Sequence, residues 1–378
     1  MKIRNLILII GAAAFLCLLS IGTLICPDRD FSENENRYLQ GMPRLTFDKV
    51  LSGDFAEEAE GYLTDQIVFR EAWVAGKNLM ERAMGIQDMN GVYLCEDGRL
   101  VERITDAEFN WSQYKRNLQQ ISLLTEELKK YNIPVDVMMV PTAAYVCRDV
   151  LPEHAVRFDE DKAFTQAEVL LGDSMIDLRP QMTGEGAERM FFRTDHHWTG
   201  YGTFVGYNAY RERLGEAKLT WEDCRPDTLT EEFYGTLYSK VLLPSLTPDM
   251  IQIPADALDA EYTVMMDGEM HGSLFFRDFL DKKDKYAVYF GGNYAKVDIS
   301  MENSRGSEDL LIIKDSFANS FVPYLLDDFG YITMVDTRFY REDISQLAKD
   351  YDRVLVLYGM ANMGQQRMVL LSGLTGGE

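Results

Sequence analysis

The stretch Leu310-Leu311-Ile312-Ile313-Lys314-Asp315-Ser316-Phe317-Ala318-Asn319-Ser320 decides the fold, because it combines a strand, a sharp turn and the start of a helix. A short, continuous apolar run is typical of a strand buried on both faces of a parallel sheet. Further runs of this kind stand at 135–140, 286–290, 331–335 and 354–358. Helical patterns follow the later runs, at 317–329, 341–350 and 361–371. This alternation predicts an α/β fold in which helices flank a parallel sheet.

Upstream of this region the same signals continue. Amphipathic spacing predicts helices at 54–84, 111–131, 161–171 and 200–214. Apolar alternation around Asp97-Gly98 predicts a hairpin between residues 89 and 102. Residues 218–280 break the alternation of helix and strand, and we interpret them as an inserted mixed lobe.

The N-terminus predicts a transmembrane helix. Lys2 and Arg4 precede an uncharged run at 6–26, which spans roughly 30 Å as a helix. Basic residues before the run and acidic ones after it place the bulk of the chain outside the cytoplasm, as a single-pass protein of the cell membrane. A cleaved signal peptide is the alternative, although the run is long for one and no small-residue cleavage site stands out. Cys26 resembles the cysteine of a lipoprotein box, but Ile25 stands where a small residue is expected.

We therefore divide the chain into a signal-anchor at 1–27, a stalk and helical segment at 28–85, and a catalytic domain at 86–378. The formal charge of −23 argues against nucleic-acid binding, which needs a basic surface. Beyond the anchor only Cys95, Cys147 and Cys224 remain, so at most one disulfide can form. Their spacing fits no metal site, and no cofactor is implied.

Ser316 stands at the turn between strand and helix, where function gathers in α/β sheets. There its hydroxyl lies beside the free amides of the helix start, which can stabilise an oxyanion. The alternative is that Ser316 or Asp315 merely caps the helix. A rival nucleophile is Ser174 in Gly172-Asp173-Ser174, a motif of serine esterases. It follows a helix pattern rather than an apolar strand, so its setting is wrong.

The second chemical signal is Asp195-His196-His197-Trp198, which holds two of the four histidines of the chain. Histidine is the usual proton-transfer group near neutral pH, and an adjacent aspartate can orient it. In an extended stretch Asp195 and His197 point to the same side, so we expect His196 to turn away. A metal site here lacks further ligands at suitable spacing.

Together these residues resemble the bacterial DHHW proteins, which are similar to the SGNH-hydrolase-like O-acetyltransferases of the alginate-acetylation type. The resemblance rests on Asp195-His196-His197-Trp198, the later Lys314-Asp315-Ser316-Phe317, and the early Asn34-Glu35-Asn36-Arg37 with Gly98 in the hairpin. It covers most of the chain beyond the anchor. In that group the acid–histidine loop precedes the serine, as it does here.

The resemblance implies a triad of Ser316 as nucleophile, His197 as base and Asp195 as orienting acid. The alginate-type pattern has a hydroxyl residue at position 196, so the presence of His196 leaves the choice of base open, and we favour His197. His196 can instead bond a backbone carbonyl or line the substrate groove.

Gly292 and Asn293, which follow the predicted strand at 286–290, are the candidates for the oxyanion hole; an ordinary exit from the strand is the alternative. Trp198 either packs under the loop or contacts a sugar. The segment 140–142 ends the first core strand and should border the same cleft.

Two functions remain open. The first is serine-dependent acyl (acetyl) transfer or ester hydrolysis on an extracytoplasmic polysaccharide, with a partner of the membrane-bound O-acyltransferase type implied by the resemblance. The second is a non-catalytic surface protein of the same fold that binds glycan or such a partner.

Overall fold

The computed structural model describes residues 2–32 and 37–371 of the chain. Asn34-Glu35-Asn36 of the early motif therefore lies outside the described residues. The chain divides into two compact units. The first consists of Met1–Asn90 with Tyr238–Ser245, and the second of Gly91–Leu237 with Leu246–Glu378.

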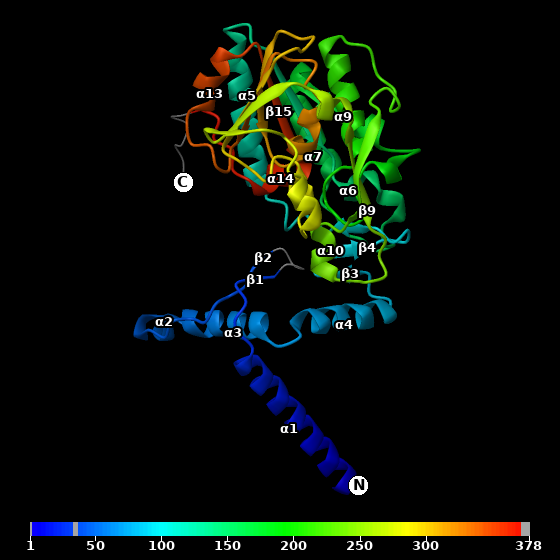
Figure 1. Ribbon diagram of the computed structural model, residues 1–378, viewed down its shortest axis with the longest axis vertical. Coiled ribbons are helices and arrows are strands. Elements are labelled where there is room, and N and C mark those ends of the chain that lie inside the picture. The colour runs from blue at the N-terminus through cyan, green and yellow to red at the C-terminus, as the bar shows by residue number, and fades with distance from the viewer. Residues whose placement is uncertain (1, 33–36, 372–378) are drawn as a thin grey trace. The chain divides into compact units, whose positions relative to one another are not determined.

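The first unit is mainly helical (Figure 1). Among the described residues, α1 (Lys2–Ile25) is the one helix long and apolar enough to cross a membrane, a test that signal sequences also pass. A small ribbon of β1 (Phe31–Ser32) and β2 (Arg37–Tyr38) follows it. The segment then forms α2 (Phe47–Ser52), α3 (Asp54–Gln66) and α4 (Arg70–Ala83).

The second unit is built on a mixed sheet with eight strands in the described residues, in the order β11-β10-β12-β14-β13-β15-β6-β7. The five parallel strands are β14 (Tyr331–Asp336), β13 (Asp309–Lys314), β15 (Arg353–Gly359), β6 (Val135–Val140) and β7 (Met175–Asp177). The antiparallel strands are β12 (Lys296–Met301), β10 (Tyr262–Met266) and β11 (Glu269–His271). The predicted parallel sheet is thus confirmed, and an antiparallel extension continues it.

Side chains of the central strands alternate between two hydrophobic cores, one on each face of the sheet. Leu311 and Ile313 of β13 belong to one core, and Leu310 and Ile312 to the other. The first core lies under α5 (Trp111–Lys129), α7 (Glu160–Leu171), α13 (Ile344–Leu347) and α14 (Met360–Gln365). The second lies under α9 (Gly200–Leu214) and α12 (Phe317–Phe321). Helices therefore flank both faces, as predicted (Figure 1).

Shorter elements complete the chain. The predicted hairpin is present as β4 (Val92–Leu94) and β5 (Leu100–Glu102), paired through Leu94 and Leu100. A second ribbon pairs β8 (Pro226–Phe233) with β9 (Asp249–Pro254). The remaining elements are β3 (Asp88–Met89), α6 (Ala143–Val146), α8 (Arg179–Met182), α10 (Thr236–Val241) and α11 (Asp256–Asp259).

The prediction of a strand at 286–290 is wrong. Lys285–Val288 forms a 3-10 turn, and Phe290 has a φ of 64°, which no strand residue adopts. The apolar run is buried because its aromatic rings pack into the core, and burial alone does not distinguish a strand from a turn. Next to β14, on the side away from β13, the sheet continues with β12 instead of residues 286–290. The last two strands on this side, β10 and β11, come from the 218–280 segment.

Candidate active site

Ser316 lies directly after the carboxyl end of β13, at the first turn of α12. Asp315 fixes this turn: its carboxylate accepts the amide of Phe317 at 2.9 Å, the amide of Gly359 at 2.8 Å and the side-chain amide of Asn362 at 2.7 Å. The capping role thus falls to Asp315, and Ser316 makes no side-chain cap bond. Ser316 is the partly exposed residue of an otherwise buried stretch, so its hydroxyl is free for other contacts.

The structure brings the three predicted triad residues together. His197 Nε2 lies 2.8 Å from Ser316 Oγ, and His197 Nδ1 lies 2.6 Å from Asp195 Oδ1. A carboxylate only accepts, so Nδ1 carries the proton and Nε2 accepts from the serine hydroxyl. This is the arrangement of a nucleophile, a base and an orienting acid.

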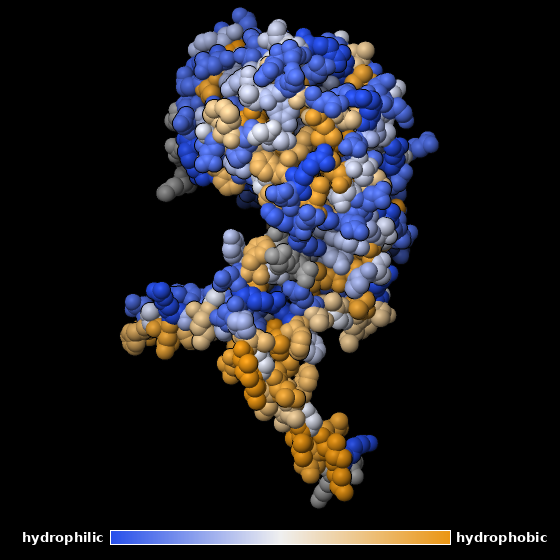
Figure 2. Space-filling view, viewed as in Figure 1, coloured by the Kyte–Doolittle hydropathy of each residue, from blue (hydrophilic) through white to orange (hydrophobic). Residues whose placement is uncertain are grey.

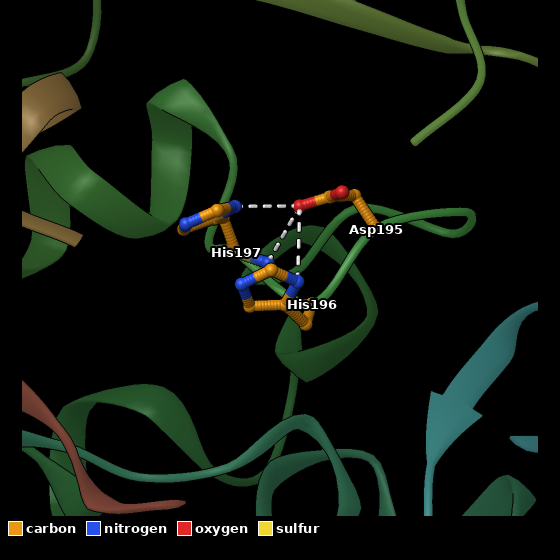
Figure 3. Close-up of side chains that lie close together, drawn as sticks. All are labelled: Asp195, His196 and His197. Atoms are coloured by element: carbon orange, nitrogen blue, oxygen red, sulfur yellow. Dashed lines mark hydrogen bonds and ion pairs between the residues drawn. The ribbon is translucent and has the colours of Figure 1, made fainter. Parts of the chain in front are cut away.

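A tight loop presents the acid and the base. Phe191 and Trp198 close it as an antiparallel bridge. Asp195 Oδ1 also accepts the amide of His197 at 3.0 Å, which bends the chain between them (Figure 3). Asp249 at the start of β9 accepts the amides of Arg193 and Thr194, both at 2.8 Å, and so holds the loop from the side.

Thr236, at the start of α10, completes the surroundings of Asp195. Its amide and hydroxyl donate to Asp195 Oδ2 at 2.7 and 2.9 Å. Gly235 allows this approach, because a Cβ there would lie 2.2 Å from the Cβ of Asp195. Both oxygens of Asp195 are therefore bound, and its orientation is fixed. Thr236 and Gly235 carry no motif of their own, so the sequence gives no signal for either residue.

Burial and charge set the protonation states of the site. Burial, reinforced by the charge of His196, lowers the pKa of His197 to about 4, while Asp195 acts in the opposite direction. Burial favours a higher pKa for Asp195, but the two histidines and the hydrogen bonds hold that pKa well below its usual range. At neutral pH the acid is therefore ionised and the imidazole is neutral, as a general base must be.

His196 does not turn away from Asp195 as expected. Its Nδ1 lies 3.8 Å from Asp195 Oδ1, and its ring contacts that of His197, with centroids 3.9 Å apart and planes tilted by 36° (Figure 3). Nδ1 bonds the hydroxyl of Thr236 at 2.8 Å rather than a backbone carbonyl. The expectation assumed an extended chain, whereas the bond from the His197 amide to Asp195 bends the loop and removes the alternation.

Two aromatic residues support the triad. Tyr286 stacks flat on His197, with centroids 3.9 Å apart and planes 7° apart, and its hydroxyl bonds the carbonyl of Ser316. Trp198 is fully buried, and its indole donates to Phe317 O at 3.1 Å and Ser320 Oγ at 2.8 Å. Of the two roles considered for Trp198, this geometry fits packing under the loop. Tyr286 was missed because it stood inside a predicted strand.

Asn293 lies beside the turn that carries Ser316. Its Oδ1 accepts from Lys314 Nζ at 3.1 Å and from Asn319 Nδ2 at 3.2 Å, two residues that flank Ser316 in the sequence. Because both partners donate, Oδ1 is the bound atom and the amide nitrogen of Asn293 points elsewhere. Gly292 precedes it with a φ of 143° and open space where a Cβ would stand. The side-chain N–H groups of Asn293 are therefore available as donors beside the turn that carries Ser316.

Lys314 is itself unusual, because it is almost completely buried. It also bonds Asn319 Oδ1 at 2.8 Å and lies 3.6 Å from Asp336 Oδ2. Burial lowers the pKa of Lys314 to about 8, although Asp336 opposes this shift. A buried ammonium that ties three polar side chains together fixes their orientation.

A small recess of about 40 Å³ opens beside His196. It is lined by Val140, Pro141 and Thr142 at the end of β6, and by Phe317 and Gly359. The predicted contribution of the 140–142 segment is thus in place. A single water needs about 10 to 15 Å³ on this scale, so the recess suits a group of a few atoms rather than a sugar ring.

The other two candidate sites do not share this geometry. Ser174 lies in a 3-10 turn at the amino end of β7, whereas Ser316 follows the carboxyl end of a parallel strand. Asp195, His196 and His197 place ligand atoms within 4.8 Å of one another. Those of Asp195 and His197 are already engaged with each other, with Thr236 and with Ser316, which does not fit a metal.

Comparison with known proteins gives a family and a fold. A family model described as DHHW protein matches residues 130–335, more than half of the chain. Alginate biosynthesis protein AlgX of Azotobacter vinelandii is 36% identical over 92 residues, which are 22% of this chain and 19% of AlgX. This chain therefore matches about a fifth of the length of that curated relative.

Two solved structures are similar over most of their length. Bacillus cereus PatB1 with a sulfonyl adduct has a TM-score of 0.61 at 23% identity, covering 72% of this chain and 95% of PatB1. A DHHW family protein from Eubacterium siraeum has a TM-score of 0.57 at 22% identity, covering 74% of this chain and 96% of the other. These likenesses show a shared fold.

Proposed function

The chain belongs to the DHHW family, and from this premise we propose that it is an extracytoplasmic, serine-dependent O-acyltransferase or esterase that acts on a polysaccharide. The observation that carries the proposal is the chain of contacts from Ser316 through His197 to Asp195, at 2.8 and 2.6 Å. Capping does not account for Ser316, because Asp315 already caps the helix.

The residues define a two-step reaction. Ser316 Oγ attacks the acyl carbonyl while His197 Nε2 takes its proton, and Asp195 stabilises the resulting imidazolium. The carbonyl oxygen becomes an oxyanion, for which the amide nitrogen of Asn293 and the backbone at Gly292 are the proposed donors. Collapse of this intermediate expels the donor alcohol, which takes the proton from His197. A sugar hydroxyl or water then attacks the acyl-serine in the same way.

Size and resemblance favour acetyl as the acyl group. We place its methyl group in the small recess lined by His196 and Phe317, which adjoin His197 and Ser316 in the sequence. AlgX is named for alginate biosynthesis, which supports a polysaccharide as the acceptor here. The family resemblance further implies a membrane-bound O-acyltransferase that supplies the acetyl group, and α1 would keep the two proteins in one membrane.

The alternative is a binding protein that keeps the fold without the chemistry. A binder has no need of a neutral, oriented imidazole on a serine hydroxyl, and the low pKa of His197 therefore favours the enzyme.

The test is turnover of p-nitrophenyl acetate by the full chain in detergent micelles, with and without excess glycan acceptor. An enzyme releases p-nitrophenol, and a transferase also yields acetylated glycan that mass spectrometry detects. Absence of p-nitrophenol release and of an acyl-enzyme, in a protein that is folded by circular dichroism, would support the binder.

The proposed location has its own test. If α1 is an uncleaved anchor with the bulk of the chain outside, protease added to spheroplasts should degrade the region from residue 28 onward. N-terminal sequencing of the membrane-bound protein should begin at residue 1 or 2. Full protection of the chain in intact spheroplasts would overturn the external location, and a new N-terminus near residue 27 would identify a cleaved signal.

A further inference from the structure

Helix α4 carries an exposed apolar stripe. Phe69, Trp73, Met80 and Met84 are 72%, 45%, 65% and 64% exposed. Trp73 and Met80 are seven residues apart, so they lie on one face of α4, and Phe69 and Met84 flank its two ends, four residues before Trp73 and four residues after Met80. Four large apolar side chains in a row on a soluble surface mark an interaction site rather than ordinary surface variation.

The opposite face of α4 is already occupied. Asn78 is fully buried, and its side chain donates to Val241 O at 2.6 Å. Arg82 bonds the hydroxyl of Ser245. Both partners belong to the same compact unit as α4. The helix is therefore oriented by protein contacts on one side, and the stripe is the side left bare.

The bare stripe continues onto the proposed membrane helix. The rings of Trp73 and Phe15 meet edge to face, 5.9 Å apart. Val68 donates its amide to Thr23 Oγ1 at 3.2 Å and packs over Gly22. Figure 2 shows orange, hydrophobic side chains along α1 and on the adjoining part of the helical segment. The same lipid that surrounds α1 is thus the nearest apolar medium for α4.

We propose that α4 lies in the lipid interface with the stripe of Phe69, Trp73, Met80 and Met84 inserted among the acyl chains. Aromatic residues beside a membrane span and an apolar face opposite a polar one are the marks of such a helix. The charges of α4 nearly balance, with three basic and two acidic side chains, so insertion depends on apolar contact rather than on anionic lipid. A second membrane contact beside α1 limits the rotation of this unit about the α1 axis.

The test is depth-dependent quenching in liposomes of phosphatidylcholine with brominated acyl chains. The full chain is reconstituted through α1, in a Trp73→Phe background that leaves Trp111, Trp198 and Trp221 as a constant signal. A reporter is placed by Met80→Trp, and a matched control by Arg82→Trp. These positions are two residues apart, so they point to nearly opposite sides of the helix at similar height.

Insertion predicts that bromine quenches the Met80→Trp signal about threefold more than the Arg82→Trp signal, and that aqueous iodide shows the reverse order. Met84→Trp should repeat the Met80 result at the far end of the helix. Equal quenching of the two faces, or iodide access to Met80→Trp, would overturn the proposal. Protection of the stripe from both quenchers would do so as well, because it would indicate a protein partner or a second copy. Flotation of each variant with the liposomes shows that α1 is inserted.

Discussion

The chain contains two Asp-Ser pairs, Asp315-Ser316 and Asp173-Ser174, and they occupy opposite ends of the parallel strands. Ser316 follows the carboxyl end of β13, where Asp315 caps the next helix and His197 reaches the hydroxyl. Ser174 precedes the amino end of β7, where the Asp173 carbonyl accepts from Arg213. One Asp-Ser pair thus has a histidine on its serine hydroxyl, and the other has an arginine on its aspartate carbonyl.

The position of an Asp-Ser pair relative to the strands therefore determines which side chains its serine meets. Gly172-Asp173-Ser174 matches a sequence motif of serine esterases. Its residues Asp173 and Ser174 line a groove together with 134–136 and α5, and Asp195 and His197 do not line this groove. Lys314-Asp315-Ser316-Phe317 does not match that motif. It nevertheless places Ser316 at the edge of the sheet where the parallel strands β13, β15 and β6 end.

Ser316→Ala should abolish acyl-enzyme formation and lower kcat by a factor on the order of 10³ or more, because it removes a member of a triad. Ser174→Ala is the matched control and should leave kcat within error of the unchanged protein. Both are measured with p-nitrophenyl acetate. Loss of activity in the Ser174 variant with retention in the Ser316 variant would reverse the assignment.

His197→Ala should cost as much as Ser316→Ala, about 10³-fold, and the double variant should be little worse, because triad members act as a unit. His196→Ala is the neighbouring control and should keep measurable activity, since His196 contacts Thr236 and not Ser316. Steady-state rates of Ser316→Ala, His197→Ala, the double variant and His196→Ala show which histidine is the base. If His196→Ala is inactive and His197→Ala is active, the choice of base is wrong.

The pH profile follows from the burial of His197. The base works when neutral, so protonation below its pKa stops the reaction, and that pKa is lowered to about 4. kcat/KM should therefore stay level from pH 7 to about 5 and fall only as the pH approaches 4, whereas an ordinary imidazole would give a fall between 7 and 6. A fall centred at pH 6 to 7 would show that His197 is not shifted in the way its burial requires.

Asn293→Ala should lower kcat by about 10²-fold with little change in KM, as loss of an oxyanion donor does. Lys314→Met should have a smaller effect in the same direction, because Asn319 still binds Asn293 Oδ1. Thermal unfolding of each variant separates lost catalysis from lost stability. An unchanged kcat in the Asn293→Ala variant would show that Asn293 does not stabilise the oxyanion and that the Gly291–Asn293 turn only connects its neighbours.

Gly235→Ala should reduce kcat by about tenfold, because a Cβ at this position meets Asp195 and must displace it, and small displacements of a catalytic group are costly. Gly272→Ala is a suitable control, since nothing lies within 4 Å of the position of its Cβ. Equal rates for the two variants would mean that the orientation of Asp195 is not critical.

Much of this site could be predicted from the sequence. The carboxyl ends of β13 and β6 follow from short apolar runs that alternate with helical patterns, as strands buried on both faces of a parallel sheet do. The Asp-His-His-Trp loop stands out because histidine is rare in the chain. That this loop meets Ser316 is implied by the resemblance to the DHHW proteins, because the loop lies between a 3-10 turn and α9 rather than at the end of a parallel strand.

The rest depends on contacts that no local pattern records. Thr236 and Gly235 come from a segment without motifs, yet they hold Asp195. Tyr286 stacks on His197 from a 3-10 turn, and the apolar composition of that turn wrongly predicts a strand. The ring of His196 stays beside Asp195 because a side-chain bond bends the loop. The burial of His197, which lowers the pKa of its imidazole, appears only in the folded chain.

Identification of the residue that an ester or a sulfonyl fluoride modifies tests directly whether Ser316 is the nucleophile. The full chain is incubated with p-nitrophenyl acetate or a sulfonyl fluoride, quenched in acid, digested with trypsin and sequenced by mass spectrometry. We predict one added group on Ser316, in the peptide that begins at Asp315, and none in the His197→Ala variant. A modification at Ser174, or an unmodified Ser316 in a protein that still hydrolyses the ester, would contradict the account.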